Sequence, residues 1–149
     1  MSEFAFKSHR PYLPVVFLGA LALAGTLWGC RAAPDPALAT STYPSAKKQT
    51  ETLNVQVARE NTSIVLTNTT ARRLPTCTMW LNASFAREIG DLRVGESARY
   101  ELSEFCNEFG ERFRAGGFFA IEPPDLLVLA QLEYEDHMAG LIVVQGKGN

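Results

Sequence analysis

The sequence predicts an all-β domain, a single antiparallel β-sandwich of about seven short strands. Apolar and polar side chains alternate with a period of two in several short runs, and glycine or proline separates these runs. No stretch after residue 52 has the spacing of a long amphipathic helix. Short strands separated by turn residues are typical of sandwiches and barrels, so we expect one of these architectures.

The chain begins with a different kind of segment, which we expect to form a hydrophobic signal helix. Its apolar run extends from Tyr12 to Gly29, follows the basic residues Lys7 and Arg10, and stops at Cys30. The run has 18 residues, which is at the lower limit for crossing a bilayer of about 30 Å. Both an export signal and an uncleaved transmembrane anchor are compatible with this pattern.

The end of the run resembles the signal of bacterial lipoproteins. An aliphatic, a variable and a small residue precede the cysteine, in the order Leu27, Trp28, Gly29 and Cys30. The resemblance implies that residues 1–29 are removed and that Cys30 carries lipid. Because Arg31 follows the cysteine, it also implies passage to the outer membrane, facing the periplasm, if the host is Gram-negative. An uncleaved anchor and ordinary secretion remain alternatives.

The composition after the signal limits both the folded part and its partners. Lys7, Arg10 and Glu3 leave with the signal, so 12 basic and 15 acidic residues remain, and nucleic acid is an unfavourable partner. The stretch 30–52 is rich in proline, alanine and threonine, and we expect a lipidated cysteine followed by a disordered tether. The folded domain is then expected at 53–145, with a tail at 146–149.

The first strands of this domain follow from alternation. We expect strands at 53–58, 63–68 and 76–82, with a short strand or loop around Leu92 and Val94. In the strand 76–82, the side chains of Cys77, Met79 and Leu81 should share one face, and those of Thr78 and Trp80 the other.

The later strands are expected at 97–102, 125–134 and 140–145, the last two joined as a hairpin by residues 135–139. The region 103–115 is ambiguous, because phenylalanines four residues apart would also suit a short helix. Gly110 and the Gly116-Gly117 pair favour a turn at 107–111 between short strands.

The order of these elements resembles that of immunoglobulin-like domains in bacterial lipoproteins of unassigned activity. The resemblance rests on the strand 63–68, which ends at Asn68, followed by a strand with Cys77 and Trp80 at Cys-x-x-Trp spacing. It covers 53–145 and implies a single immunoglobulin-like β-sandwich. It carries over architecture only, and no functional residue.

Two cysteines are left once Cys30 is assigned to lipid. A bridge between Cys77 and Cys106 would close a loop of about 30 residues and could contribute about 3 to 4 kcal/mol. Two free thiols, one of them buried among strands, are the alternative.

No arrangement of residues points to catalysis, and we expect neither an enzyme nor a cofactor. His137 is the one histidine after the signal, and its predicted hairpin loop suits a solvated turn residue. A copper-binding module is an alternative, because Cys77 with Met79 and His137 with Met138 supply sulfur and imidazole ligands.

The strongest candidate for a binding surface is a cluster of aromatic and arginine side chains. Five of the six phenylalanines after the signal fall between residues 105 and 119. The partner-binding residues that we predict are Phe109, Arg112, Phe113, Arg114 and Phe118. The alternative is a loop held to the core by its own side chains.

Together these patterns predict a lipid-anchored cell-envelope protein with a non-enzymatic binding or structural module. Its partners would be the membrane, through the lipid, and an envelope protein or polymer. Besides the copper module, an accessory subunit held by an uncleaved transmembrane helix is the competing hypothesis.

Overall fold

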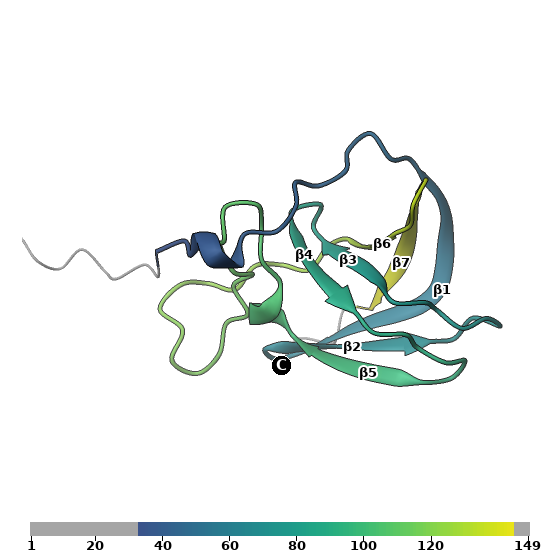
Figure 1. The fold of residues 1–149 in the computed structure, drawn as a ribbon. Coiled ribbons are helices and arrows are strands. Elements are labelled where there is room, and N and C mark those ends of the chain that lie inside the picture. The colour runs from purple at the N-terminus through teal and green to yellow at the C-terminus, as the bar shows by residue number, and fades with distance from the viewer. Residues whose placement is uncertain (1–32, 145–149) are drawn as a thin grey trace, which may run out of the picture. The chain divides into compact units, whose positions relative to one another are not determined.

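Seven strands form a single mixed sheet in the computed structural model, which describes residues 33–144 (Figure 1). The predicted signal 1–29, Cys30 and the tail 146–149 lie outside the described residues. The strands are β1 (Gln49–Glu60), β2 (Ser63–Asn68), β3 (Cys77–Leu81), β4 (Phe85–Ile89), β5 (Ser97–Glu101), β6 (Ala130–Glu133) and β7 (Met138–Val144). Two short 3-10 turns accompany them, η1 (Pro36–Leu38) and η2 (Leu102–Glu104).

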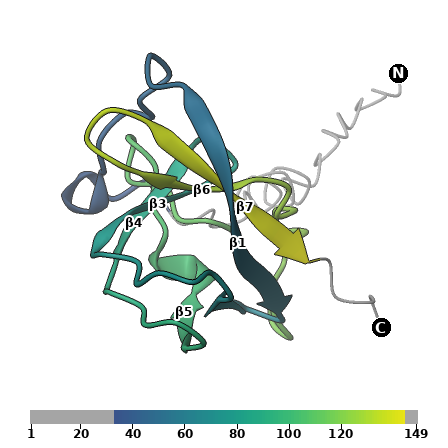
Figure 2. The ribbon, with the colours of Figure 1, turned by 90° about the vertical axis from the view of Figure 1, so that its right-hand side faces the viewer.

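The strand order is β4-β3-β6-β7-β1-β2-β5, and the sheet curls like a half-barrel (Figures 1 and 2). Strand β1 pairs antiparallel with β2 and parallel with β7, and the register against β7 shifts between Thr52 and Gln56. The prediction of an all-β protein is therefore confirmed, whereas a purely antiparallel arrangement is wrong at this pair. Alternation in a sequence identifies a strand but not its partner, and β1 meets a strand from the far end of the chain.

The concave side of the sheet holds the main core. Its largest fully buried side chains come from four strands and from the segments between them: Ile64, Leu66, Leu74, Met79, Leu81, Ile89, Leu92, Leu102, Phe105, Phe113 and Leu132. A second, smaller cluster lies on the other face of β3, where Trp80 packs with Ala86 and Met138. The predicted two faces of β3 are thus confirmed, and both are covered.

Most strands lie within or close to the predicted ranges, but β1 begins at Gln49 rather than at residue 53, and β6 covers only Ala130–Glu133 of the predicted strand 125–134. The structure has β2 at the predicted residues. Residues 107–111 form the predicted turn and not a helix, and the backbone N–H of Asn107 donates to Glu111 O at 2.9 Å. Strand β4 was not predicted. Its neighbouring charges Arg87 and Glu88 mask the alternation, and β4 lies at an edge of the sheet, where one side is open to water.

The segment before β1 is not an extended tether. The N–H of Asp35 donates to Gly110 O at 3.2 Å, and the N–H of Thr40 donates to Asn107 O at 3.1 Å. Tyr43 packs edge-on against Trp80 with a centroid distance of 5.3 Å. The domain therefore begins well before residue 53, because a few specific contacts compensate for a composition that has little apolar surface.

Between residues 33 and 144, no helix is both long and apolar enough to cross a membrane.

Candidate functional site

The aromatic cluster of the sequence divides into a buried half and an exposed half. Phe105 and Phe113 have exposed fractions of 0% and 1%, and Phe113 packs edge-on against Phe85 at 5.2 Å between ring centroids. The guanidinium of Arg59 lies over the Phe113 ring at 5.9 Å. Phe113 is therefore a core residue, and its prediction as part of a binding surface is wrong. Its backbone N–H donates to Phe105 O, which turns both rings inward.

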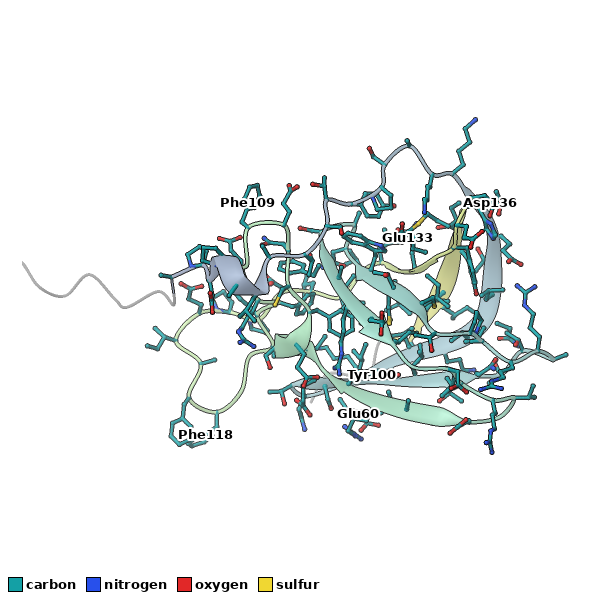
Figure 3. All side chains as sticks on the ribbon, in the orientation of Figure 1. Glu60, Tyr100, Phe109, Phe118, Glu133 and Asp136 are labelled. Carbon is teal, nitrogen blue, oxygen red and sulfur yellow. The ribbon has the colours of Figure 1, made fainter. Side chains whose placement is uncertain are left out.

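Phe109 lies at the tip of the turn 107–111, and its side chain is 66% exposed (Figure 3). The turn is held by Asn107, whose Oδ1 accepts from the N–H groups of Phe109 and Glu111 at 3.0 and 2.8 Å. Arg112 donates to Ser103 O at 3.0 Å and so closes the hairpin behind the turn. The hydrogen bonds of Asn107 and Arg112 therefore fix the turn that exposes Phe109 to solvent.

Loop 115–124 carries the most exposed apolar side chains of the described residues. Phe118, Phe119 and Ile121 are 95%, 90% and 94% exposed. The two phenyl rings contact each other edge-on at 5.0 Å and touch nothing that buries them. Figure 3 shows Phe118 projecting away from the sheet at the end of this loop. Clusters of this kind on a protein surface mark interaction sites.

The base of the loop is closed by an ion pair between Arg114 and Asp125, which we call the clasp. Arg114 Nε donates to Asp125 Oδ1 at 2.8 Å, and the backbone N–H of Arg114 donates to Oδ2 at 2.9 Å. In return the N–H of Asp125 donates to Arg114 O at 2.9 Å. Arg59 also binds the base, donating to Ala115 O at 2.7 Å and to Asp125 O. The two ends of the loop are thus fixed to each other and to β1.

The charge on Asp125 is favoured by this arrangement. Partial burial pushes the pKa of Asp125 upward, but the hydrogen bonds from Arg114 and the positive charge of Arg59 outweigh it. The pKa therefore lies below its ordinary value, and the carboxylate is charged at neutral pH. The side chain of Asp125 is only 15% exposed, so solvent competes weakly for it.

Two glycines allow the chain to leave the clasp. Gly116 and Gly117 have φ angles of 81° and 124°, which side-chain-bearing residues rarely adopt. A Cβ at Gly116 would also lie 3.0 Å from Pro124 Cβ. The loop turns outward here because only glycine fits, and Ala120 N then donates to Gly117 O at 3.1 Å to close its tip.

The sequence prediction identified part of this loop. Arg114 and Phe118 belong to its base and tip, and Phe109 and Arg112 belong to the neighbouring hairpin. Asp125 and Arg59 were missed, since no short-range pattern joins them to Arg114. Ile121 could have been found, because it ends the apolar run that begins at Phe118, just before Glu122 and two prolines.

A groove of about 990 Å³ lies on the face of β3 and β4 that points away from the main core. In it Glu133 accepts from Lys47 Nζ at 2.8 Å and from Trp80 Nε1 at 2.7 Å. Partial burial tends to raise the pKa of Glu133, but these two hydrogen bonds outweigh it and leave the pKa below its ordinary value. The groove's central carboxylate is therefore charged and satisfied by the protein itself.

Cys77 and Cys106 are free thiols. Ala86 of β4 pairs with Trp80 on one side and with Cys106 on the other, whereas Cys77 pairs with Ile89. The two cysteines are thus two strand spacings apart, roughly 9.6 Å, and three residues apart along the strands, about 10 Å. A disulfide needs Cα atoms within about 7 Å, so the bridge is incompatible with this register.

The structure separates the two methionines of the copper hypothesis, whereas Cys77 and His137 both line the groove. Met79 belongs to the main core, while Met138 belongs to the cluster around Trp80. His137 stacks on Tyr134 at 5.0 Å, and its Nδ1 lies 2.6 Å from Asp136 Oδ1. Within the part of the chain that the structure describes, no three histidine, cysteine or acidic side chains gather as a metal site.

Comparisons with protein-family models, with curated proteins and with solved structures find no match to this chain.

Proposed function

We propose that the chain is a lipid-anchored cell-envelope protein whose folded part is a non-enzymatic binding module, and that loop 115–124 is its binding element. The observation that carries the proposal is the contrast within this loop between an exposed tip and a fixed base. Phe118, Phe119 and Ile121 are each at least 90% exposed, while Arg114 and Asp125 hold the base in one geometry. A rigid support lowers the entropy that binding would cost.

The chemistry of the groove supports a role without catalysis. Burial raises the pKa of Cys77 to about 11, so its thiol is protonated at neutral pH and is a poor nucleophile. Both oxygens of Glu133 are engaged, one with Lys47 and the other with Trp80. The same hydrogen bonds lower the pKa of Glu133, and a carboxylate with a lowered pKa is a weaker general base at neutral pH.

The lipid anchor is supported by the sequence Leu27-Trp28-Gly29-Cys30. The N–H of Asp35, five positions after Cys30, already donates to Gly110 O, so a lipid on that cysteine would hold the domain close to the membrane. For a Gram-negative host we place it on the outer membrane, facing the periplasm.

We also propose that the curled sheet is a variant of the immunoglobulin-like sandwich. The curl of the sheet supports this relation, because in Figure 1 β2 and β5 lie below β3, β4, β6 and β7, and β1 borders both groups in the strand order. The parallel pair of β1 and β7 is where it departs from an antiparallel sandwich.

Intact mass tests the anchor. The chain extracted from native membranes should lack residues 1–29 and carry added acyl mass, and the Cys30→Ser variant should lose that mass. A matched Cys77→Ser variant should keep it. An unprocessed, unmodified chain would contradict the proposal and favour the accessory-subunit hypothesis.

A further inference from the structure

We infer that loop 115–124 binds the lipid bilayer itself, inserting the side chains of Phe118, Phe119 and Ile121 beside the lipid anchor. This inference rests on the proposed function and names the partner of its binding element. Its basis is the position of the loop relative to the place where the chain enters the domain.

The chain enters the domain at the same end that carries the exposed aromatic residues. The N–H of Asp35 donates to Gly110 O, so the entry point adjoins the turn that presents Phe109. In Figure 1, η1 and the loop after the hairpin both lie at the left-hand end of the domain. Figure 3 labels Phe109 and Phe118 at that end, both pointing outward.

Loop 115–124 is held at this end through its base, where Arg59 near the end of β1 donates to Ala115 O at 2.7 Å. A Cβ at Gly117 would lie 3.5 Å from Thr62 Cγ2, and Thr62 follows the end of β1. Thr62 O also accepts from the N–H of Leu102, the first residue of η2. The opposite end of β2 is marked by Asn68, whose N–H donates to Glu96 O at 2.9 Å.

Chain length then sets how far this end can be from the membrane. Cys30 precedes Asp35 by five residues, which span at most about 18 Å when fully extended. A lipid on Cys30 therefore keeps the hairpin with Phe109 within that reach of the bilayer surface. The face that would meet the lipid is the one that exposes the largest apolar side chains.

The chemistry of the tip suits a bilayer. Transfer of two phenyl rings and an isoleucine from water to the boundary between headgroups and acyl chains lowers the free energy, as it does for the apolar residues of interfacial segments. The carboxylate of Glu122 lies 3.4 Å from Arg114 Nη1, so the one charge within the loop is directed toward the clasp. Insertion of the tip therefore requires no charge to enter the hydrocarbon.

Depth-dependent quenching tests the inference on the acylated full chain. The Phe118→Trp variant is extracted from membranes and reconstituted into vesicles of phosphatidylethanolamine and phosphatidylglycerol, with acyl chains that are either plain or brominated. The matched control is Val94→Trp, an apolar residue that is 58% exposed in the turn beside Asn68. Trp80 is common to both variants and supplies the same background.

Brominated lipid should quench the added tryptophan at 118 and leave the one at 94 unquenched. If brominated lipid quenches the added tryptophan in neither variant, although the chains are acylated and bound to vesicles, the inference is overturned and the lipid anchor stays intact. A chain that is neither acylated nor carried upward with floating vesicles would overturn the anchor and the inference together. As a control, both variants should unfold at the same temperature as the wild-type chain, so that the comparison concerns folded protein.

Discussion

Phe113 and Phe118 belong to one aromatic cluster in the sequence but have opposite surroundings in the structure. Phe113 is 1% exposed, and its N–H donates to Phe105 O, so backbone pairing commits its ring to the core. Phe118 follows Gly116 and Gly117, where the backbone turns away from the sheet, and is 95% exposed. The density of aromatic residues thus locates a structurally important region, while backbone pairing decides which of them are available to a partner.

The largest effect should come from the same substitution at these two positions. Phe113→Ala should lower the free energy of unfolding by about 3–5 kcal/mol, because it removes a ring from a packed core. Phe118→Ala should change it by no more than about 0.5 kcal/mol, because the ring is already in water. Urea unfolding of the two variants measures both. Similar losses at the two positions would show that the loop packs against the domain.

Opening the clasp should loosen the backbone of the loop without unfolding the core. Asp125→Ala removes the acceptor for both the side chain and the backbone N–H of Arg114, so cleavage by chymotrypsin after Phe118 and Phe119 should become several-fold faster. Glu122→Ala is the matched control, since its contact with Arg114 is longer, at 3.4 Å, and lies outside the base. Equal cleavage rates in wild type and Asp125→Ala would contradict the clasp.

The clasp should also depend on pH in one direction. The pKa of Asp125 is lower in the folded chain than its ordinary value, which is about 3.9 in an unfolded chain, so its charge stabilises the fold above that value. This stabilisation is lost as the pH falls through the folded pKa and both states become protonated. Arg114, Arg59 and Glu122 are the charged groups around it.

The stability difference between wild type and Asp125→Asn should therefore be constant above about pH 5 and shrink below about pH 4. Urea unfolding across this range measures it. A difference that grows on acidification has the wrong sign for a charged clasp.

The smallest effect is expected in the groove. Glu133→Gln weakens the hydrogen bonds from Lys47 and Trp80. Because the charged groups of Lys47 and Glu133 are both partly exposed, we expect the free energy of unfolding to fall by about 1 kcal/mol or less. Trp80 fluorescence and urea unfolding follow the change. Chymotrypsin cleavage of loop 115–124 should stay at the wild-type rate, and faster cleavage would show that the two regions are coupled.

Local patterns in the sequence predicted much of the framework. The positions of β2 and β3, the two faces of β3, and the turn at 107–111 follow from alternation and from Asn107 and Gly110. Strand β4 was missed because an edge strand tolerates the charges Arg87 and Glu88.

Contacts between distant residues could not be predicted in this way. The parallel pairing of β1 with β7 and the docking of Asp35 on Gly110 join segments far apart in the chain. The same holds for Arg59 at the base of the loop, and a short motif cannot contain such a partner. The prediction of Phe113 as a binding residue failed for this reason, since its burial depends on Phe85 and Arg59.

The most direct test of what covers loop 115–124 is photo-crosslinking from position 118 in native membranes. A benzoylphenylalanine in place of Phe118 should yield adducts with the mass of phospholipid, while the same group at Val94 should yield none. Adducts of protein size at position 118, without lipid adducts, would contradict a membrane-inserted loop and identify a protein as its occupant.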